Sequence, residues 1–204
     1  MTEHYYTPHP QVPHNRRVIR EGIRGREFQL VVDAGVFSKG GVDFGTRLLA
    51  EAVEIPPGSR VLDMGCGYGP LGLAALSLHP DNRVWMVDIN ARAVELAREN
   101  LKLNRLENGV VLQGDGFAPV AGLLFDCILM NPPVRAGKAL LFSLYEGALH
   151  HLVEGGSLWL VIRKKQGAAS TEKKLQELFG AGNVEEVERK KGYFVFRAQK
   201  KISR

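Results

Sequence analysis

The chain has 204 residues, of which 45% are hydrophobic and 24% charged, a composition typical of one globular domain and not of a disordered chain. Two cysteines, Cys66 and Cys127, are too few for a disulfide scaffold, so we expect a reduced, cytoplasmic setting. The net charge of +5 is unevenly distributed along the chain. Residues 1–26 carry five basic and two acidic side chains, residues 27–162 carry ten basic and fifteen acidic ones, and residues 163–204 carry twelve basic and five acidic ones. Basic flanks around an acidic centre are typical either of a solubilising surface or of a rim that binds a polyanion.

The sequence contains no apolar run of the ~18 residues that a bilayer span requires. Its N-terminal segment also lacks the apolar stretch of a secretory signal, so we expect a soluble protein without a membrane partner. The histidines of that segment, His4, His9 and His14, have no Cys or carboxylate at ligand spacing, and no metal site is expected.

The elements expected before residue 58 form an extension. In chain order they are an irregular arm (residues 1–15), a β-hairpin (Arg17–Arg20 and Phe28–Val32 around a turn at Glu21–Gly25), a glycine-rich loop (Gly35–Gly41) and a helix (Thr46–Val53). The segment Pro56-Pro57-Gly58 ends the helix. We predict that residues 1–57 pack on a core formed by residues 58–204, within one domain overall.

From residue 60, short apolar strands alternate with helical segments. The expected strands are Arg60–Met64, Val84–Asp88, Gly109–Gln113, Phe125–Asn131 and Ser157–Ile162. The expected helices are Leu71–Leu78, Ala91–Leu103, Lys138–Leu152 and Ala168–Phe179. This alternation predicts an α/β fold with a parallel sheet covered on both faces. An antiparallel hairpin of Val184–Glu188 and Tyr193–Arg197 is expected to end the chain.

The most informative local motif follows the first core strand. Asp63 lies in that strand, and the alternating glycines Gly65, Gly67 and Gly69 lead into a helix that Pro70 opens. Ligands of open α/β sheets bind beyond the carboxyl ends of the strands, where glycines let the backbone approach them closely. Without a second signal, a glycine-rich turn that binds nothing would be a serious alternative.

The second signal is Asp88, at the end of the next expected strand and 19 residues after Gly69. A carboxylate about 20 residues past a glycine motif is placed to accept hydrogen bonds from the hydroxyls of a ribose. The two signals together favour a nucleoside ligand.

The third signal is Asn131-Pro132-Pro133-Val134, at the end of the fourth expected core strand. Prolines after a strand commonly only end it. Here they lie at the ligand edge of the sheet, where the Asn131 side chain and the Pro132 carbonyl can accept hydrogen bonds from a substrate.

These motifs resemble those of class I S-adenosylmethionine (SAM) methyltransferases. Asp63 and the three glycines are similar to the D-x-G-x-G-x-G loop, which implies that this loop holds the amino-acid end of SAM. Gly114-Asp115-Gly116 resembles the adenine-contacting motif, with Ile89 beside Asp88 as a further implied cofactor residue. The N-P-P-x sequence resembles that of enzymes that methylate planar nitrogens. In them the side-chain oxygen of the Asn131 equivalent and the carbonyl of the Pro132 equivalent accept the N–H groups of the target amine.

A wider resemblance covers about Phe28 to Phe196. Gly35-Val36-Phe37-Ser38, Val42-Asp43-x-Gly45-Thr46 and Asn131–Lys138 are similar to the catalytic domain of the C-type small-subunit ribosomal RNA guanine-N2 methyltransferases. The resemblance implies a Rossmann-like, seven-stranded fold, SAM as cofactor without a metal, and an RNA partner, either ribosomal RNA or a ribosomal particle. It also implies that Asp43 and Thr46 lie near the methionine end of SAM, with a helix cap as the alternative role of Thr46.

The chain departs from the better-known members of that family in two ways. They carry two tandem methyltransferase-like domains, and they tend to have Phe where this chain has Val134, followed by Arg135. Stacking on the target base is then expected from Phe37 or from an Arg side chain, with Pro133 and Val134 as further substrate contacts. Arg135 and Lys138 are either a phosphate clamp or ordinary surface charge.

Three other functions stay open at this point. A protein glutamine methyltransferase also uses N-P-P-x, and a SAM-binding, RNA-associated module would need no turnover. A nicotinamide dehydrogenase would use a different glycine spacing, G-x-G-x-x-G. The sequence predicts neither the target nucleotide nor the oligomeric state.

Overall fold

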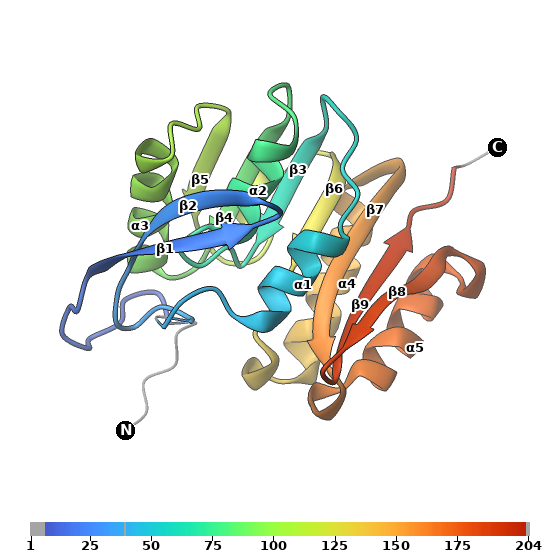
Figure 1. The fold of residues 1–204 in the computed structure, drawn as a ribbon. Helices are drawn as coiled ribbons and strands as arrows, with labels where there is room; N and C mark the ends of the chain where they lie inside the picture. The colour runs from blue at the N-terminus through green and yellow to red at the C-terminus, as the bar shows by residue number, and fades with distance from the viewer. Residues whose placement is uncertain (1–6, 39, 203–204) are drawn as a thin grey trace.

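The central element of the computed structural model, which describes residues 7–38 and 40–202, is a seven-stranded sheet (Figure 1). In spatial order its strands are β5 (Gly109–Gln113), β4 (Arg83–Asp88), β3 (Arg60–Met64), β6 (Phe125–Met130), β7 (Leu152–Arg163), β9 (Tyr193–Gln199) and β8 (Val184–Lys190). The strands from β5 to β7 are parallel, and β9 runs antiparallel to both β7 and β8. The predicted α/β class and the antiparallel C-terminal hairpin are confirmed.

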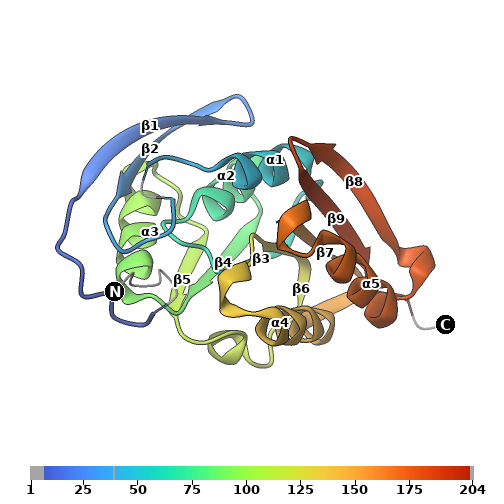
Figure 2. The same ribbon diagram turned by 90° about the horizontal axis from the view of Figure 1, so that it is seen from below.

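Helices cover both faces of this sheet (Figure 2). They are α1 (Phe44–Ala52), α2 (Pro70–Leu78) and α3 (Ala91–Leu103) on one face, and α4 (Lys138–His151) and α5 (Ala168–Phe179) on the other. Because successive strand side chains point to opposite faces, Val61 and Cys127 join the first core while Leu62 and Ile128 join the second. Short 3-10 helices occur at Ala118–Val120, Val134–Ala136, Lys164–Gln166 and Ala181–Asn183. Within the described residues, no helix has both the length and the hydropathy needed to cross a bilayer.

The N-terminal hairpin, β1 (Arg17–Ile23) and β2 (Arg26–Val32), forms a separate two-stranded sheet against α3. The buried Asn100 side chain of α3 pairs with the Val31 main chain, accepting its N–H at 2.6 Å and donating to its carbonyl at 3.1 Å. The turn is shorter than the predicted Glu21–Gly25. Only Arg24 and Gly25 leave the ladder, with φ of 50° and 73°, values that suit a two-residue type I′ hairpin.

Several other element boundaries differ from the prediction, and two of them have a clear structural cause. Helix α1 begins at Phe44 and not at Thr46, because the Asp43 carboxylate caps it by accepting the N–H groups of Gly45 and Thr46. Strand β7 begins at Leu152, before its predicted start at Ser157, because Leu152 pairs with Phe125. The β6–β7 ladder is irregular between this pair and Cys127–Ser157, and Gly155 in the irregular stretch has φ of +77°.

Candidate functional site

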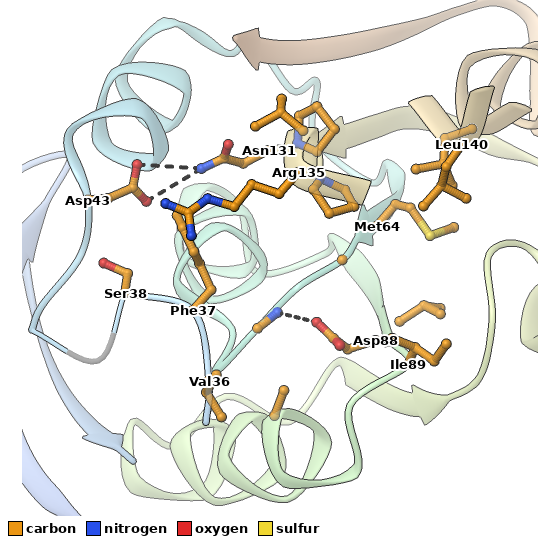
Figure 3. Close-up of a pocket in the computed structure, with 18 of the residues that line it drawn as sticks. Val36, Phe37, Ser38, Asp43, Met64, Asp88, Ile89, Asn131, Arg135 and Leu140 are labelled. Atoms are coloured by element: carbon orange, nitrogen blue, oxygen red, sulfur yellow. Dashed lines mark hydrogen bonds between the residues drawn. The ribbon is translucent and has the colours of Figure 1, made fainter. Parts of the chain in front are cut away.

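A cavity of about 750 Å³ opens at the carboxyl ends of β3, β4 and β6 (Figure 3). Predicted site residues from distant segments line it: Phe37, Gly65, Gly67, Asp88, Ile89, Asp115, Gly116, Asn131, Pro132, Pro133, Val134 and Arg135. Thr46 and Asp63 line a small adjoining hollow, which Gly65 and Asn131 share. Gly69 and Lys138 line neither space: Gly69 is the buried N-cap of α2, and the Lys138 ammonium lies 5.2 Å from the centre of the Phe142 ring.

The glycine turn after β3 presents its main chain to this cavity. Gly65 and Gly67 have φ of 72° and 56°, which favour glycine, and a Cβ on either would meet nothing within 4 Å. Strand β4 holds the turn in place, because the Val87 carbonyl accepts the N–H groups of Gly65 and Cys66 at 2.8 and 3.0 Å. A ligand can therefore approach the main chain closely without having to order the turn first.

Asp88 connects the glycine turn with the start of α3. Its Oδ2 accepts the Gly67 N–H at 2.8 Å and its Oδ1 accepts the Asn90 N–H at 2.9 Å. Each carboxylate oxygen can accept more than one hydrogen bond, so the group keeps acceptor capacity for the hydroxyls of a ligand. Burial raises the pKa of this carboxyl group.

Asp63 is 1% exposed and lies under the same turn, where its Oδ2 accepts the Gly72 N–H of α2 at 2.8 Å. Burial, together with the negative charge of Asp88, raises the pKa of Asp63 to about 7. Asp43 and Asp63 both line the small hollow. This hollow is a suitable place for a cationic group such as an amino-acid ammonium.

Asn131 is oriented by the first turn of α1. Its Nδ2 donates to Thr46 Oγ1 at 3.0 Å and lies 3.4 and 3.5 Å from the two Asp43 carboxylate oxygens (Figure 3). Asp43 also accepts the Thr46 hydroxyl hydrogen. A carboxylate can only accept, so the amide nitrogen must face Asp43 and the Asn131 Oδ1 is left for another donor. Sequence reasoning did not anticipate this orienting contact, although it had placed Asp43 and Thr46 near the site.

The two prolines after Asn131 bend the chain sharply. Pro133 has φ of −76° and ψ of 73°, an inverse γ-turn in which the Pro132 carbonyl accepts the Val134 N–H at 2.9 Å. The carbonyl keeps a second lone pair for a substrate donor. The turn also brings the exposed Arg135 to the cavity wall.

The structure adds cavity residues that the motifs had not indicated. Arg163 ends β7, Gln166 follows it, and Tyr193 begins β9. The Arg163 guanidinium lies 4.8 Å from the centre of the Tyr193 ring. The rule that ligands bind beyond the carboxyl ends of strands, applied to β7, would have indicated Arg163. Val12 of the N-terminal arm also lines the cavity, and no motif had pointed to it.

The described residues suit a nucleoside cofactor with an amino-acid tail. They provide an open glycine turn, a carboxylate with free acceptor capacity at Asp88, and an acidic hollow beside Asn131. SAM has the matching groups, namely a ribose diol and a cationic methionine end. In the part of the chain that the structure describes, no three His, Cys, Asp or Glu side chains are grouped so that they could hold a metal ion.

Comparisons with known proteins agree with this geometry. The family described as methyltransferase small domain matches residues 27–197. The uncharacterized protein YbxB of Bacillus subtilis (strain 168) is 45% identical over 202 residues, 98% of this chain and 100% of that protein. The ribosomal RNA small subunit methyltransferase C of Pseudomonas putida (strain W619) is 41% identical over 137 residues, 65% of this chain and 41% of that protein.

A solved structure with the same fold is the T. thermophilus 16S rRNA N2 G1207 methyltransferase in complex with AdoMet and guanosine. It matches with a TM-score of 0.83 at 30% identity, over 94% of this chain and 52% of that chain. The chain thus spans about half or less of the length of the ribosomal RNA enzymes that it matches.

Proposed function

Because the chain belongs to the methyltransferase small domain family, we propose that it transfers a methyl group from SAM to an exocyclic amine of RNA, with guanine N2 of ribosomal RNA as the target. The observation that carries the proposal is the Asn131 carboxamide. Its nitrogen is held by Thr46 and Asp43, and its oxygen remains available at the cavity wall. The relatives named as ribosomal RNA methyltransferases support the choice of substrate.

We assign the cofactor to the end of the cavity formed by the glycine turn and Asp88. Asp88 accepts the ribose hydroxyls, Ile89, Asp115 and Gly116 surround the base, and Gly65 and Gly67 allow close approach of the main chain. The acidic hollow of Thr46 and Asp63 receives the methionine end, while Gly69 supports the turn from the start of α2. When bound, SAM supplies an electrophilic methyl group and accepts the bonding electron pair at its sulfur.

The target amine lies at the other end, where Asn131 Oδ1 and the Pro132 carbonyl accept its two N–H groups. These hydrogen bonds turn the nitrogen lone pair out of conjugation with the base and direct it toward the cofactor end. No side chain needs to remove a proton beforehand, because the nitrogen becomes acidic once it is methylated and then releases its proton to solvent. Positioning and exclusion of water thus account for the rate, a contribution that can reach effective molarities of ~10⁵–10⁸ M.

We assign the surface around Asn131 to the RNA. Phe37 is 39% exposed at the cavity wall and offers a ring on which a base can stack, beside the apolar Pro133 and Val134. Arg135 is exposed at the same edge and is suited to a phosphate, with Lys138 farther out. A base in a loop or a flipped base is required, because the amine must reach a pocket at the strand ends.

The test is methyl transfer from isotope-labelled SAM to ribosomal RNA taken from cells that lack the gene. We expect label in N2-methylguanosine when the RNA nucleosides are analysed by mass spectrometry, and little label with the Asn131→Ala variant. Binding to RNA should weaken steeply with added salt. Label in protein glutamine would favour the other N-P-P-x chemistry. SAM binding without any transfer would favour a non-catalytic module, and binding of NAD in place of SAM would overturn the cofactor assignment.

A further inference from the structure

Residues 7–15, the described part of the N-terminal segment and called the arm below, contribute to the cavity although they lie outside the segment that matches the family. That segment begins at residue 27, whereas Val12 lines the cavity together with Ala34, Gly35 and Val36 of the loop after β2. The arm is also joined to α3, because the Pro8 carbonyl accepts the N–H of Ala91, the first residue of that helix, at 2.9 Å. Ala91 follows Asp88 by three residues. The arm therefore borders the end of the cavity assigned to adenosine.

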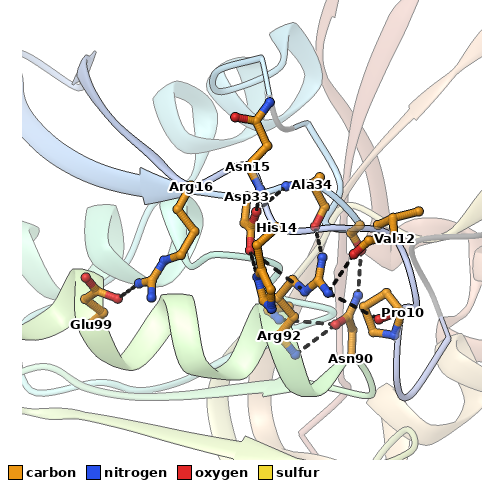
Figure 4. A network of polar contacts seen from close by, with 12 residues as sticks. Pro10, Val12, His14, Asn15, Arg16, Asp33, Ala34, Asn90, Arg92 and Glu99 are labelled. Carbon is orange, nitrogen blue, oxygen red and sulfur yellow. Dashed lines mark hydrogen bonds and ion pairs between the residues drawn. The ribbon is translucent and has the colours of Figure 1, made fainter.

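Arg92 is the main polar anchor of the arm (Figure 4). Its guanidinium donates to the carbonyls of Pro10 at 3.2 Å and Val12 at 3.0 Å, and also to the carbonyl of Ala34 at 2.6 Å. The side chain is 10% exposed, so these donors have little access to water. One rigid, multidentate group thus joins the arm, the loop after β2 and the start of α3.

Asp33 provides a second anchor at the end of the arm. This carboxylate is 1% exposed and accepts the Asn15 N–H at 2.6 Å, and His14 Nδ1 lies 2.5 Å from it. The Arg92 Nε lies 3.8 Å from the same carboxylate. Burial alone would raise the pKa of Asp33, but the hydrogen bonds from Asn15, His14 and Ala34 outweigh it and lower that pKa. The arm is therefore attached at Pro8 and at Asn15 to segments that neighbour the residues lining the cavity.

Gly35 shows how closely the arm approaches the loop after β2. Its φ is +79°, and a Cβ built on it would lie 2.9 Å from Val12 Cγ2 and 3.0 Å from Pro10 Cβ. The same Cβ would lie 3.1 Å from Arg92 Nη1. A side chain at residue 35 would thus be strained itself and would press on the arm and on its anchor.

We propose that the arm forms a wall of the adenosine end of the cofactor site, and that Arg92 is a positioning residue that holds this wall in place. The inference rests on the proposed function, since it takes the ligand to be SAM. It extends the site to residues that the family match does not include. Arg92 makes its contacts to main-chain carbonyls of the arm and the loop, and acts on the ligand through Val12 and its neighbours.

Calorimetric binding of S-adenosylhomocysteine to the full chain tests this assignment. Arg92→Ala and Gly35→Ala should each raise the Kd about tenfold, because ligand binding must then also order the arm. The matched control is Arg98→Ala, on the same helix, which removes hydrogen bonds to the Val111 carbonyl without touching the arm and should leave the Kd nearly unchanged. Hydrogen exchange of the peptide covering residues 7–16 should slow on ligand binding in the unmodified protein, and much less in Arg92→Ala.

The outcomes separate the two proposals. If S-adenosylhomocysteine does not bind the unmodified protein, the cofactor assignment fails. If it binds, and Arg92→Ala keeps the Kd of the unmodified protein or the arm shows no slowed exchange, the arm is not a wall of the site. If Arg92→Ala lowers the melting temperature no more than Arg98→Ala does but weakens binding, general destabilisation is excluded as the cause.

Discussion

The two ends of the cavity are built differently. The end assigned to the cofactor consists of main chain and short side chains, such as Gly65, Gly67 and Asp88, which hydrogen bonds within the chain already hold. The end assigned to the RNA carries long side chains, Arg135 and Arg163, which are exposed at its rim. The cofactor is the same in every reaction cycle, so it can bind to a wall that is already ordered when the chain folds. The RNA is large and must present one base, so side chains that can change conformation are better suited to bind it.

Asn131 lies where the two ends meet, and its replacement should give the largest effect on turnover. Asn131→Ala removes the oriented amide oxygen, so kcat should fall about 10²–10³-fold, the scale for one preorganised polar group. The Kd for S-adenosylhomocysteine should change little, because the glycine turn and Asp88 remain. Steady-state methylation of ribosomal RNA and calorimetry measure the two quantities. Near-normal turnover would contradict the role of Asn131, and a large loss of binding would mean that the two ends are not separable.

Asp88→Ala tests the end of the cavity assigned to the cofactor and should mainly lower the affinity for the cofactor product. The variant loses two charge-assisted hydrogen bonds to hydroxyls and leaves the Gly67 N–H without its acceptor, so the Kd for S-adenosylhomocysteine should rise about 10²-fold. Asp81→Ala is the matched control, since Asp81 is exposed just before β4 at the opposite edge of the sheet. An equal, small effect of both replacements would argue against a diol-binding role for Asp88.

The same contrast explains what the sequence could predict. Some site residues follow local sequence motifs at strand ends, namely Asp63, the alternating glycines, Asp88 and Asn131. The structure places them around the cavity and its adjoining hollow. Val12 and Tyr193 reach the cavity through packing between distant segments, and Arg92 reaches the arm in the same way. Such packing leaves no local pattern in the sequence. Helix α1 was predicted to begin at Thr46, with a helix cap as one possible role of that residue, whereas the structure gives the capping role to Asp43.

The carboxyl group of Asp63 should make the stability of the ligand-free protein pH-dependent. Its folded-state pKa of about 7 lies above the ordinary carboxyl value, so the folded chain binds this proton more tightly than the unfolded chain does. The free energy of unfolding should therefore fall as pH rises, by about 2 kcal/mol between pH 5 and pH 7. Asp63→Asn keeps an acceptor for the Gly72 N–H and should flatten this dependence. Denaturant titrations at both pH values measure it, and parallel profiles for the two proteins would contradict the assignment.

We expect the smallest effect from a substitution at the end of the cavity assigned to the RNA. Arg135→Gln should raise the KM for RNA by a few-fold and make the salt dependence of RNA binding shallower by about 0.7–0.9 in log–log slope, as for one lost phosphate contact. Arg83→Gln makes the same change of charge at an exposed position that begins β4, at the far edge of the sheet, and should change neither quantity. Binding of S-adenosylhomocysteine should stay constant in both variants. If Arg135→Gln instead weakens cofactor binding and leaves the salt slope unchanged, Arg135 belongs to the end assigned to the cofactor, and the division of the cavity into two ends would have to be redrawn around it.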